Sequence, residues 1–519
     1  MKAVFLYVIL FFTSPLSYAV SDPGGERDGE TKDKGHEIAE MLTNNYKKTV
    51  SSCGDLEQPA YLCSGVMFRG TNPSERYNSW DPSPASVKSG GVSFSYLRED
   101  AEFNRLAFYY QNGFIIYNEY DIPADDMNSL NMLCFFPIDG HTGDRDEAGC
   151  GEHPRYKDVS KPCQDQGINT AQGWMDRFNN MPAGANEFEY QCGFLVMQDG
   201  KYHGTTGFYQ GVEAARQLNK KVLHQDNEVR VATWDTTAAG YPESFPVAAF
   251  FYLYSTDKKE NSITRGIEGA QHDQLSFYKQ TGIWVPIIRL TLPKNESDET
   301  LFAYSSADQK VVDVSVNIPQ ATGDDGRELT RNDYYRLSDL TVDIPDYSGL
   351  DEGDEVTLIW DAPRHRYEAG KKTVSSAKDV HFSVPRREFL DAIGSTVKLS
   401  FSVRKKAKEE MQSSKIFRLS VEKQSLDLPA PTLDMASTQL TVKFKEMTIH
   451  DRISIRFEGI NQHDPARING NSDGRVNFTV PATWINENAG REIYITYAVG
   501  NDRGERYQFS RVLRVLVPG

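Results

Sequence analysis

Apolar and polar residues alternate in two different ways along the chain. Over residues 59–293, strand-like runs such as "GGVSFSY", "NMLCFFPI" and "VAAFFYLY" are interleaved with stretches at helical spacing, such as "TAQGWMDRFNNM" and "GAQHDQLSFYKQ". A further helix is predicted by the apolar spacing of residues 38–46. This mixture predicts an α+β domain over residues 37–320.

The C-terminal part contains only strand-like alternation, and it repeats itself. "DEVTLIWDAP" returns as "DRISIRFEGI", "VHFSVP" as "VNFTVP" and "STVKLSFSV" as "REIYITYAV", at an offset of about 96 residues. That spacing is typical of one β-sandwich, so two immunoglobulin-like domains are predicted at residues 321–428 and 429–519, joined by the Pro-rich "DLPAPTLD". They resemble the repeat modules of bacterial surface and secreted proteins of the adhesin kind.

The first residues have the composition of an export signal. "MKAVFLYVILFFTSPLSYAV" contains one lysine, a short apolar run and the small residues "SYA" before Val20. We therefore predict a signal peptide at residues 1–19, followed by a polar, Gly-rich flexible leader at 20–36. No later apolar run is long enough to cross a bilayer, so a secreted or periplasmic protein without a membrane span is expected.

Charge and cysteine content narrow the class of protein. Lys and Arg number 57 against 73 Asp and Glu, a net charge of -16 that argues against a nucleic-acid partner. The six cysteines are Cys53, Cys63, Cys134, Cys150, Cys163 and Cys192. An even number in an exported chain predicts three disulfides, and the spacing matches no zinc pattern, so no metal is expected. The pairing stays open, although a Cys150–Cys163 bridge would close a loop with little core of its own.

Two neighbouring predicted strands carry polar residues that suggest a binding site. "VMFRGT" places Arg69 at the end of an apolar run, before the small residues Gly70 and Thr71. In "GGVSFSYLRED", Ser93 and Ser95 point to the same side, because side chains on a strand alternate with a period of two. Each motif alone is compatible with an ordinary strand, in which Arg69 forms a surface ion pair.

Together, these motifs resemble the first two motifs of the cholera-toxin-like mono-ADP-ribosyltransferases. In that family an arginine binds a phosphate of NAD, a Ser-x-Ser strand supports the nicotinamide pocket, and a glutamate on a third strand completes the site. The resemblance implies substrate-binding roles for Arg69, Thr71, Ser93 and Ser95. An arginine suits this role because its planar guanidinium matches phosphate oxygens.

The third motif, a carboxylate or glutamine two residues before a glutamate, has three candidates. They are Asp226-x-Glu228, Glu187-x-Glu189 and Gln271-x-Asp273. Glu228 ranks first because it opens the strand-like "VRVATW", whereas Asp273, the second catalytic candidate, lies in a predicted helix. For each of them the alternative is a solvated carboxylate. An insertion carrying the cysteine loop is needed between Ser95 and Glu228.

The longer text "CSGVMFRGT" with "YNSWDPSPASVKSGGVSFSYLRED" also resembles the halovibrin-like secreted NAD glycohydrolases. The two resemblances imply an enzyme that cleaves the nicotinamide–ribose bond of NAD, with NAD as substrate and no separate cofactor. ADP-ribose would pass to water or to a host or target-cell protein, and water is favoured because Asp226 is a weak match for orienting an acceptor. The alternative is a non-enzymatic adhesin or host-surface binding protein with immunoglobulin-like modules.

Overall fold

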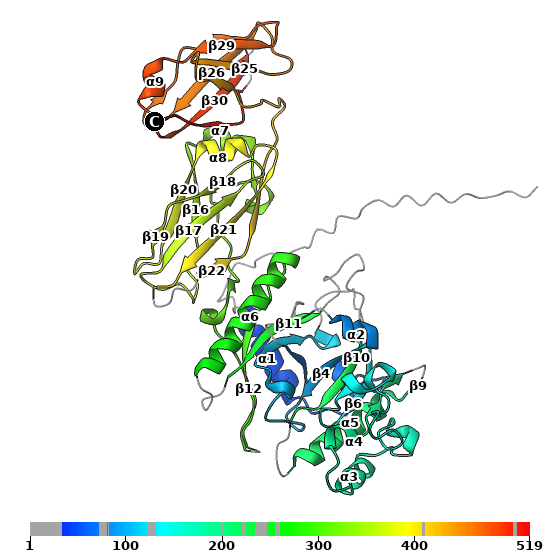
Figure 1. The fold of residues 1–519 in the computed structure, drawn as a ribbon. Coiled ribbons are helices and arrows are strands. Elements are labelled where there is room, and N and C mark those ends of the chain that lie inside the picture. Colours follow the sequence, from blue (N-terminus) through cyan, green and yellow to red (C-terminus); the bar gives the residue numbers. More distant parts are fainter. Residues whose placement is uncertain are drawn as a thin grey trace, which may run out of the picture.

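The computed structural model describes residues 34–71, 80, 82–121, 131–198, 201–220, 225–233, 246–254, 260–295, 297–406, 411–501 and 506–519. The predicted signal peptide, residues 1–19, and most of the predicted leader lie outside the described residues. The end of that leader is helical, because helix α1 (Lys34–Lys47) begins at Lys34. The structure consists of an α+β domain followed by two β-domains (Figure 1).

A nine-stranded mixed sheet forms the centre of the α+β domain. In spatial order its strands are β13 (Leu301–Tyr304), β12 (Ile287–Thr291), β11 (Val247–Leu253), β5 (Asn112–Ile116), β3 (Val66–Thr71), β4 (Gly91–Leu97), β10 (Glu228–Ala232), β6 (Met132–Phe136) and β7 (Phe194–Leu195). All pairs are antiparallel except β11 with β12. The strand-like runs of the sequence therefore form strands, as predicted.

Strand β4 pairs with β3 along one half of its length and with β10 along the other half. Its residues 95–97 pair with β3, and its residues 91–94 pair with β10. Beyond Phe68, β3 pairs with β5 alone, as far as Thr71 opposite Asn112. Because the pairing of β3 with β4 ends at Phe68, the sheet opens between Arg69 of β3 and Ser93 of β4.

Helices cover both faces of the sheet. Helix α1 packs Leu42 and Tyr46 against one face, in a core that includes Phe68 and Phe251. Helices α5 (Gly204–Asn219) and α6 (Glu260–Thr281) cover the other face through Phe208 and Phe277, which are fully buried. The remaining helices are α2 (Pro84–Ser89), α3 (Ala171–Asn179) and α4 (Glu187–Tyr190). The predicted helices at "TAQGWMDRFNNM" and "GAQHDQLSFYKQ" are confirmed as α3 and part of α6.

The cysteines form three disulfides, Cys53–Cys63, Cys134–Cys150 and Cys163–Cys192. The suggested Cys150–Cys163 bridge is wrong. Cys134 lies on β6 beside the loop that contains Cys150, with Cα atoms 5.9 Å apart. Cys163 instead lies against the chain before β7, where its N–H donates to the carbonyl of Gly193 at 2.9 Å. The Cys134–Cys150 bridge ties a loop to the large sheet, whereas Cys53–Cys63 closes a local loop of ten residues outside that sheet.

The first β-domain is a two-layer sandwich that begins at Val311, ahead of the predicted boundary at 321. One layer contains β14 (Val311–Val312), β22 (Met411–Ser414), β21 (Thr396–Arg404), β17 (Glu355–Asp361) and β18 (Arg366–Glu368), with β15 (Glu328–Leu329), β19 (Lys372–Thr373) and β23 (Phe417–Val421) alongside. The other layer pairs β16 (Asp339–Ile344) with β20 (Val380–Pro385). Alternate residues such as Trp360 and Phe401 fill the core between the layers.

The second β-domain repeats this arrangement. Its layers are β24 (Thr432–Asp434), β25 (Gln439–Lys443) and β29 (Arg475–Thr479), against β26 (Asp451–Glu458) and β30 (Glu492–Asn501) with β27 (Gln462–His463), β28 (Ile468–Asn469), β31 (Gln508–Phe509) and β32 (Leu513–Leu516). Trp360 pairs with Leu399 in the first domain as Phe457 pairs with Ile495 in the second. The internal repeat seen in the sequence is therefore a repeat of structure.

Buried glutamines join the α+β domain to the first β-domain. The Oε1 atom of Gln274, on α6, accepts from the N–H groups of Lys310 and Val311 at 2.7 and 2.8 Å. Its Nε2 group donates to Gln309 Oε1 at 2.9 Å, and the indole of Trp284 donates to the carbonyl of Val311 at 2.7 Å. Because these amides are buried and paired, this joint is part of the packed interior.

No helix among the described residues is both long enough and apolar enough to pass through a bilayer.

Candidate active site

The opening between β3 and β4 forms a cleft of about 480 Å³. Arg69, Ser93, Ser95, Asp226 and Glu228 all line it. They come from three adjacent strands, and Glu228 lies two residues after Asp226 at the start of β10. The structure thus brings together Arg69, the Ser93-x-Ser95 pair and the Asp226-x-Glu228 candidate, one from each of the three motifs.

Glu228 accepts hydrogen bonds through both of its carboxylate oxygens. Its Oε2 accepts from the N–H of Gly140 at 2.9 Å, and its Oε1 accepts from the hydroxyl of Thr142. Burial alone would raise the pKa of Glu228. The charge of Arg230 and hydrogen bonds to the carboxylate lower this pKa below its usual value. Glu228 is therefore a fixed, ionised carboxylate at neutral pH, although its side chain is almost entirely buried.

Arg230 lies on the same face of β10 as Glu228, because it is two residues further along the strand. Its guanidinium donates to Ser93 Oγ at 2.6 Å, to the carbonyl of Gly91 at 2.7 Å and to that of Ala148 at 2.9 Å. Its position is fixed by these bonds, and its charge compensates the buried Glu228. Ser93 thus orients Arg230 rather than standing free.

Arg69 differs from Arg230 in having donors to spare. Its Nη1 donates to the carbonyl of Ser93 at 3.2 Å, which is its one hydrogen bond within the part of the chain that the structure describes. Burial and the nearby charge of Arg230 lower the pKa of Arg69 to about 10, so it remains protonated at neutral pH. A charged fork with unused N–H groups at a cleft is suited to an anionic ligand.

Asp226 is held inside the cleft wall. Its Oδ2 accepts from Ser95 Oγ at 2.5 Å and its Oδ1 accepts from the N–H of Ala107 at 2.8 Å. Burial raises the pKa of Asp226 to about 7. Both oxygens are therefore occupied by partners within the protein, and Ser95 supports Asp226.

A third carboxyl group, Asp139, lies against Glu228. Its oxygens accept from the N–H of His141 at 3.1 Å and from Gln225 Nε2 at 2.8 Å. Burial and the charge of Glu228 raise the pKa of Asp139 well above its usual value. At neutral pH this carboxyl group therefore keeps a proton that it shares with Glu228.

The contribution of Asp139 and Asp226 to the free energy of unfolding should accordingly fall as the pH rises above about 4. Across this range the folded protein keeps protons on Asp139 and Asp226 that the unfolded chain releases, so rising pH favours the unfolded chain. Asp139→Asn should flatten this dependence, measured by urea unfolding at about pH 5 and about pH 8. Asp158→Asn, at a fully exposed position, is the matched control and should keep the wild-type slope. Equal slopes in wild type and Asp139→Asn would contradict the assignment.

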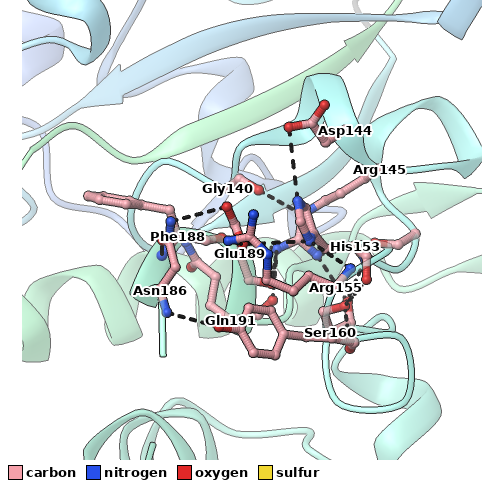
Figure 2. A network of polar contacts seen from close by, with 12 residues as sticks. Gly140, Asp144, Arg145, His153, Arg155, Ser160, Asn186, Phe188, Glu189 and Gln191 are labelled. Carbon is pink, nitrogen blue, oxygen red and sulfur yellow. Dashed lines mark hydrogen bonds and ion pairs between the residues drawn. The ribbon is translucent and has the colours of Figure 1, made fainter. Parts of the chain in front are cut away.

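The loop that carries Gly140 and Thr142 is organised around Arg145 (Figure 2). Arg145 Nε donates to the carbonyl of Gly140 at 2.7 Å. Its two terminal nitrogens donate to the carbonyls of Gly151, Ser160, Phe188, Glu189 and Gln191 at 3.0–3.3 Å. One buried guanidinium thus ties the loop after β6 to the chain before β7, and so places the Gly140 N–H against Glu228.

An exposed aromatic residue stands at the edge of the cleft. Phe108 lines the cleft, its side chain is 75% exposed, and its backbone has φ 52°. A non-glycine residue in this left-handed region carries strain, which the anchors on both sides maintain. Leu106 before it is buried, and Ala107 is bonded to Asp226. Phe108 therefore presents an exposed aromatic ring beside the buried charges, tilted against the ring of Tyr110 with 5.7 Å between centroids.

The other sequence candidates lie elsewhere. Asp273 is buried on α6, near Asn112, and does not line the cleft, and neither does Thr71 at the end of β3. Glu189 on α4 binds Arg155 at 2.5 Å. Asp139, Thr142 and Arg230 also line the cleft but were not predicted from the sequence. Of these three, only Arg230 could have been found there, because a residue two positions after Glu228 on a strand lies on the same face.

Within the described ranges, no group of three or more His, Cys, Asp or Glu side chains is arranged to hold a metal ion. The carboxyl groups of the cleft are instead bonded to protein donors.

Neither a family model nor a curated protein matches this sequence. Several solved structures match part of this chain at low sequence identity. One is a tetra-tandem repeat from the extending region of a large adhesion protein, with 13% identity, TM-score 0.16, and 40% of this chain against 49% of that chain covered. Another belongs to a 1.5-MDa bacterial ice-binding adhesin, with 11% identity, TM-score 0.16, and coverage of 40% and 65%. The FN1-FN3 domains of chicken CNTN1 match with 9% identity, TM-score 0.15, and coverage of 43% and 72%. The chain thus spans about half to two thirds of the two adhesin structures, and scores this low carry no argument about activity.

Proposed function

We propose that the α+β domain is an enzyme that cleaves the nicotinamide–ribose bond of NAD. The observation that carries this proposal is that Arg69, the Ser93-x-Ser95 strand and Glu228 line one cleft. These are the residues that resemble the three motifs of the cholera-toxin-like ADP-ribosyltransferases and the halovibrin-like NAD glycohydrolases. The three disulfides fit an oxidising compartment, in keeping with a secreted or periplasmic protein.

The chemistry proposed for the cleft follows from its charges. The bond between the ribose C1′ and the nicotinamide nitrogen breaks, and its electron pair leaves with nicotinamide, which becomes neutral. Positive charge then develops on the ribose, and the ionised Glu228 stabilises it. Water attacks C1′ and loses a proton, which gives ADP-ribose. Arg69 binds a phosphate of the substrate, and Phe108 offers a face on which a planar ring can stack.

Hydrolysis is favoured over transfer to a protein. Transfer to an arginine acceptor requires a second carboxylate to orient the acceptor, and the motif spacing assigns this role to Asp226. Asp226 is 6% exposed and both its oxygens are already bonded within the protein. Burial also raises the pKa of Asp226 to about 7, whereas the pKa of Glu228 lies below its usual value, so Asp226 is the weaker carboxylate for orienting a cationic acceptor.

Arg69→Ala should raise KM for NAD by about tenfold or more, because a charge-assisted hydrogen bond to phosphate is lost. The measurement is nicotinamide release by the purified chain over a range of NAD concentrations. Arg216→Ala, on the exposed face of α5 where Arg216 binds Glu213, is the matched control and should behave as wild type. The proposal fails if the wild-type chain releases no nicotinamide. An unchanged KM in Arg69→Ala would remove only the phosphate-binding role.

A second candidate function is that of a non-enzymatic adhesin or host-surface binding protein. The observation in its favour is that none of the residues lining the cleft comes from the two β-domains, which occupy residues 311–519. Those domains need a role other than catalysis, and attachment is one such role. The same assay separates the candidates, because a pure binding protein releases no nicotinamide.

A further inference from the structure

A groove of about 580 Å³ lies at the joint between the two β-domains. Both domains line it, and its basic side chains are all arginines: Arg336, Arg386, Arg387, Arg456 and Arg467. Its acidic side chains are Glu458 and Asp464. Five guanidinium groups against two carboxylates make the groove basic, in a chain whose net charge is -16.

Only two of these arginines are neutralised by the acidic residues of the groove. Arg456 binds Asp464 at 2.9 Å and Arg387 contacts Glu458 at 3.4 Å. Among the described residues, no carboxylate forms an ion pair with Arg336, Arg386 or Arg467. The proximity of Arg456 lowers the pKa of Arg386, in addition to the effect of burial. Arg386 donates instead to the carbonyls of Leu337 and Tyr335. The exposed Arg336 and Arg467 therefore remain available to a ligand.

Aromatic rings hold several of the guanidinium groups in place. The pairs are Arg386 over Phe509 at 5.0 Å, Arg387 over Tyr494 at 4.1 Å, Arg467 over Tyr507 at 5.5 Å and, beside the groove, Arg506 over Tyr335 at 5.5 Å. Such stacking orders long side chains before a ligand arrives and reduces the entropy lost on binding. It also covers one face of each ring with a cation.

The two walls of the groove are fixed to each other. Arg514 of the second domain binds Asp391 at 2.7 Å and Glu388 at 3.0 Å, both in helix α8 (Arg386–Asp391) of the first domain. The N–H of Val512 donates to Asp391 Oδ1 at 3.0 Å. Because Glu388 and Asp391 are buried, these contacts resist separation of the domains. The groove is therefore preformed.

We propose that this groove binds a sulfated sugar chain. Guanidinium groups match the oxygens of sulfate in a planar, two-point geometry that lysine cannot provide, and the basic lining contains arginine alone. Binding of single-stranded nucleic acid relies on bases that stack on open aromatic faces, whereas Phe509 and Tyr335 of the groove each already carry a guanidinium group on one face. The groove is therefore suited to a ligand that carries several negative charges and no aromatic rings, as a sulfated sugar chain does.

The test is titration of the full chain with a heparin-derived, fully sulfated oligosaccharide, followed by calorimetry. Wild type should bind, and affinity should fall as salt is raised. Arg336→Glu combined with Arg467→Glu should weaken binding by about tenfold or more, because both exposed arginines lack a carboxylate partner within the described structure. Arg404→Glu combined with Arg475→Glu is the matched control, since it makes the same charge change at exposed strand positions outside the groove.

Four outcomes would overturn the proposal, and the first three concern the sulfated chain itself. These three are absence of binding by the wild type, equal loss in the groove variant and the control, and binding of a desulfated oligosaccharide as tight as that of the sulfated one. A single-stranded oligonucleotide that binds as tightly as the sulfated chain would also reject sulfated sugar as the ligand class. Equal thermal midpoints of both double variants and wild type confirm that folding is unaffected. None of these readouts depends on NAD cleavage.

Discussion

Glu228→Gln should lower the rate of nicotinamide release from NAD by on the order of 10³-fold. The substitution keeps the size of the side chain and removes the negative charge that stabilises positive charge on the ribose. Affinity for NAD should change much less, because Arg69 remains to bind the phosphate. The measurement is kcat and KM for the purified variant beside wild type, with circular dichroism and a thermal midpoint to show that the variant is folded.

Glu189→Gln is the control for this experiment. It makes the same chemical change in the same domain, and Glu189 lies outside the cleft, where it binds Arg155. Its kcat should stay within about twofold of wild type. If Glu189→Gln loses activity while Glu228→Gln keeps it, the catalytic carboxylate is Glu189 on α4 and not Glu228.

Arg145→Ala should lower the free energy of unfolding by about 3 kcal/mol or more. The substitution leaves six carbonyl groups of the cysteine-bridged loops without their shared donor, and most of those groups are buried. Urea unfolding gives the stability, and the variant chain should also lose kcat, because the Gly140 N–H no longer has its support against Glu228.

Two further variants separate positioning from simple destabilisation. Arg155→Ala removes an arginine from the same loop that is 63% exposed, and should cost less than about 1 kcal/mol. Arg145→Lys keeps the positive charge but loses the branched guanidinium group. Compared with Arg145→Ala, it should regain part of the free energy of unfolding and little of the kcat. A fully active Arg145→Lys variant would show that Arg145 stabilises the loop without placing Gly140.

The order of helices and strands could be predicted because their apolar patterns are local. Arg69 and Glu228 could be located for the same reason, since each lies at an end of an apolar strand. The pairing of the cysteines could not be predicted, because it depends on which loop lies beside which strand, as Cys134 on β6 and Cys150 show. The start of the first β-domain was also missed, because Val311 and Val312 form too short a strand to give a pattern.

Several residues of the cleft could not be predicted from the sequence. Gly140 and Thr142 lie in a loop of Gly, Asp and His residues with no periodicity, and their role depends on Arg145 and its distant carbonyl partners. Asp139 becomes notable only because folding places it against Glu228. Polar loop residues acquire such roles from tertiary contacts between segments far apart in sequence, and a single sequence does not contain that information.

The glutamine joint between α6 and the first β-domain affects how this chain can be divided. A fragment that ends with the last strand of the large sheet, β13, lacks Gln309, Lys310 and Val311. The side chains of Gln274 and Trp284 would then lose these hydrogen-bond partners. A fragment that keeps these bonds must therefore extend past Val311, and a cut between β13 and β14 would leave buried polar groups of the α+β domain without their partners.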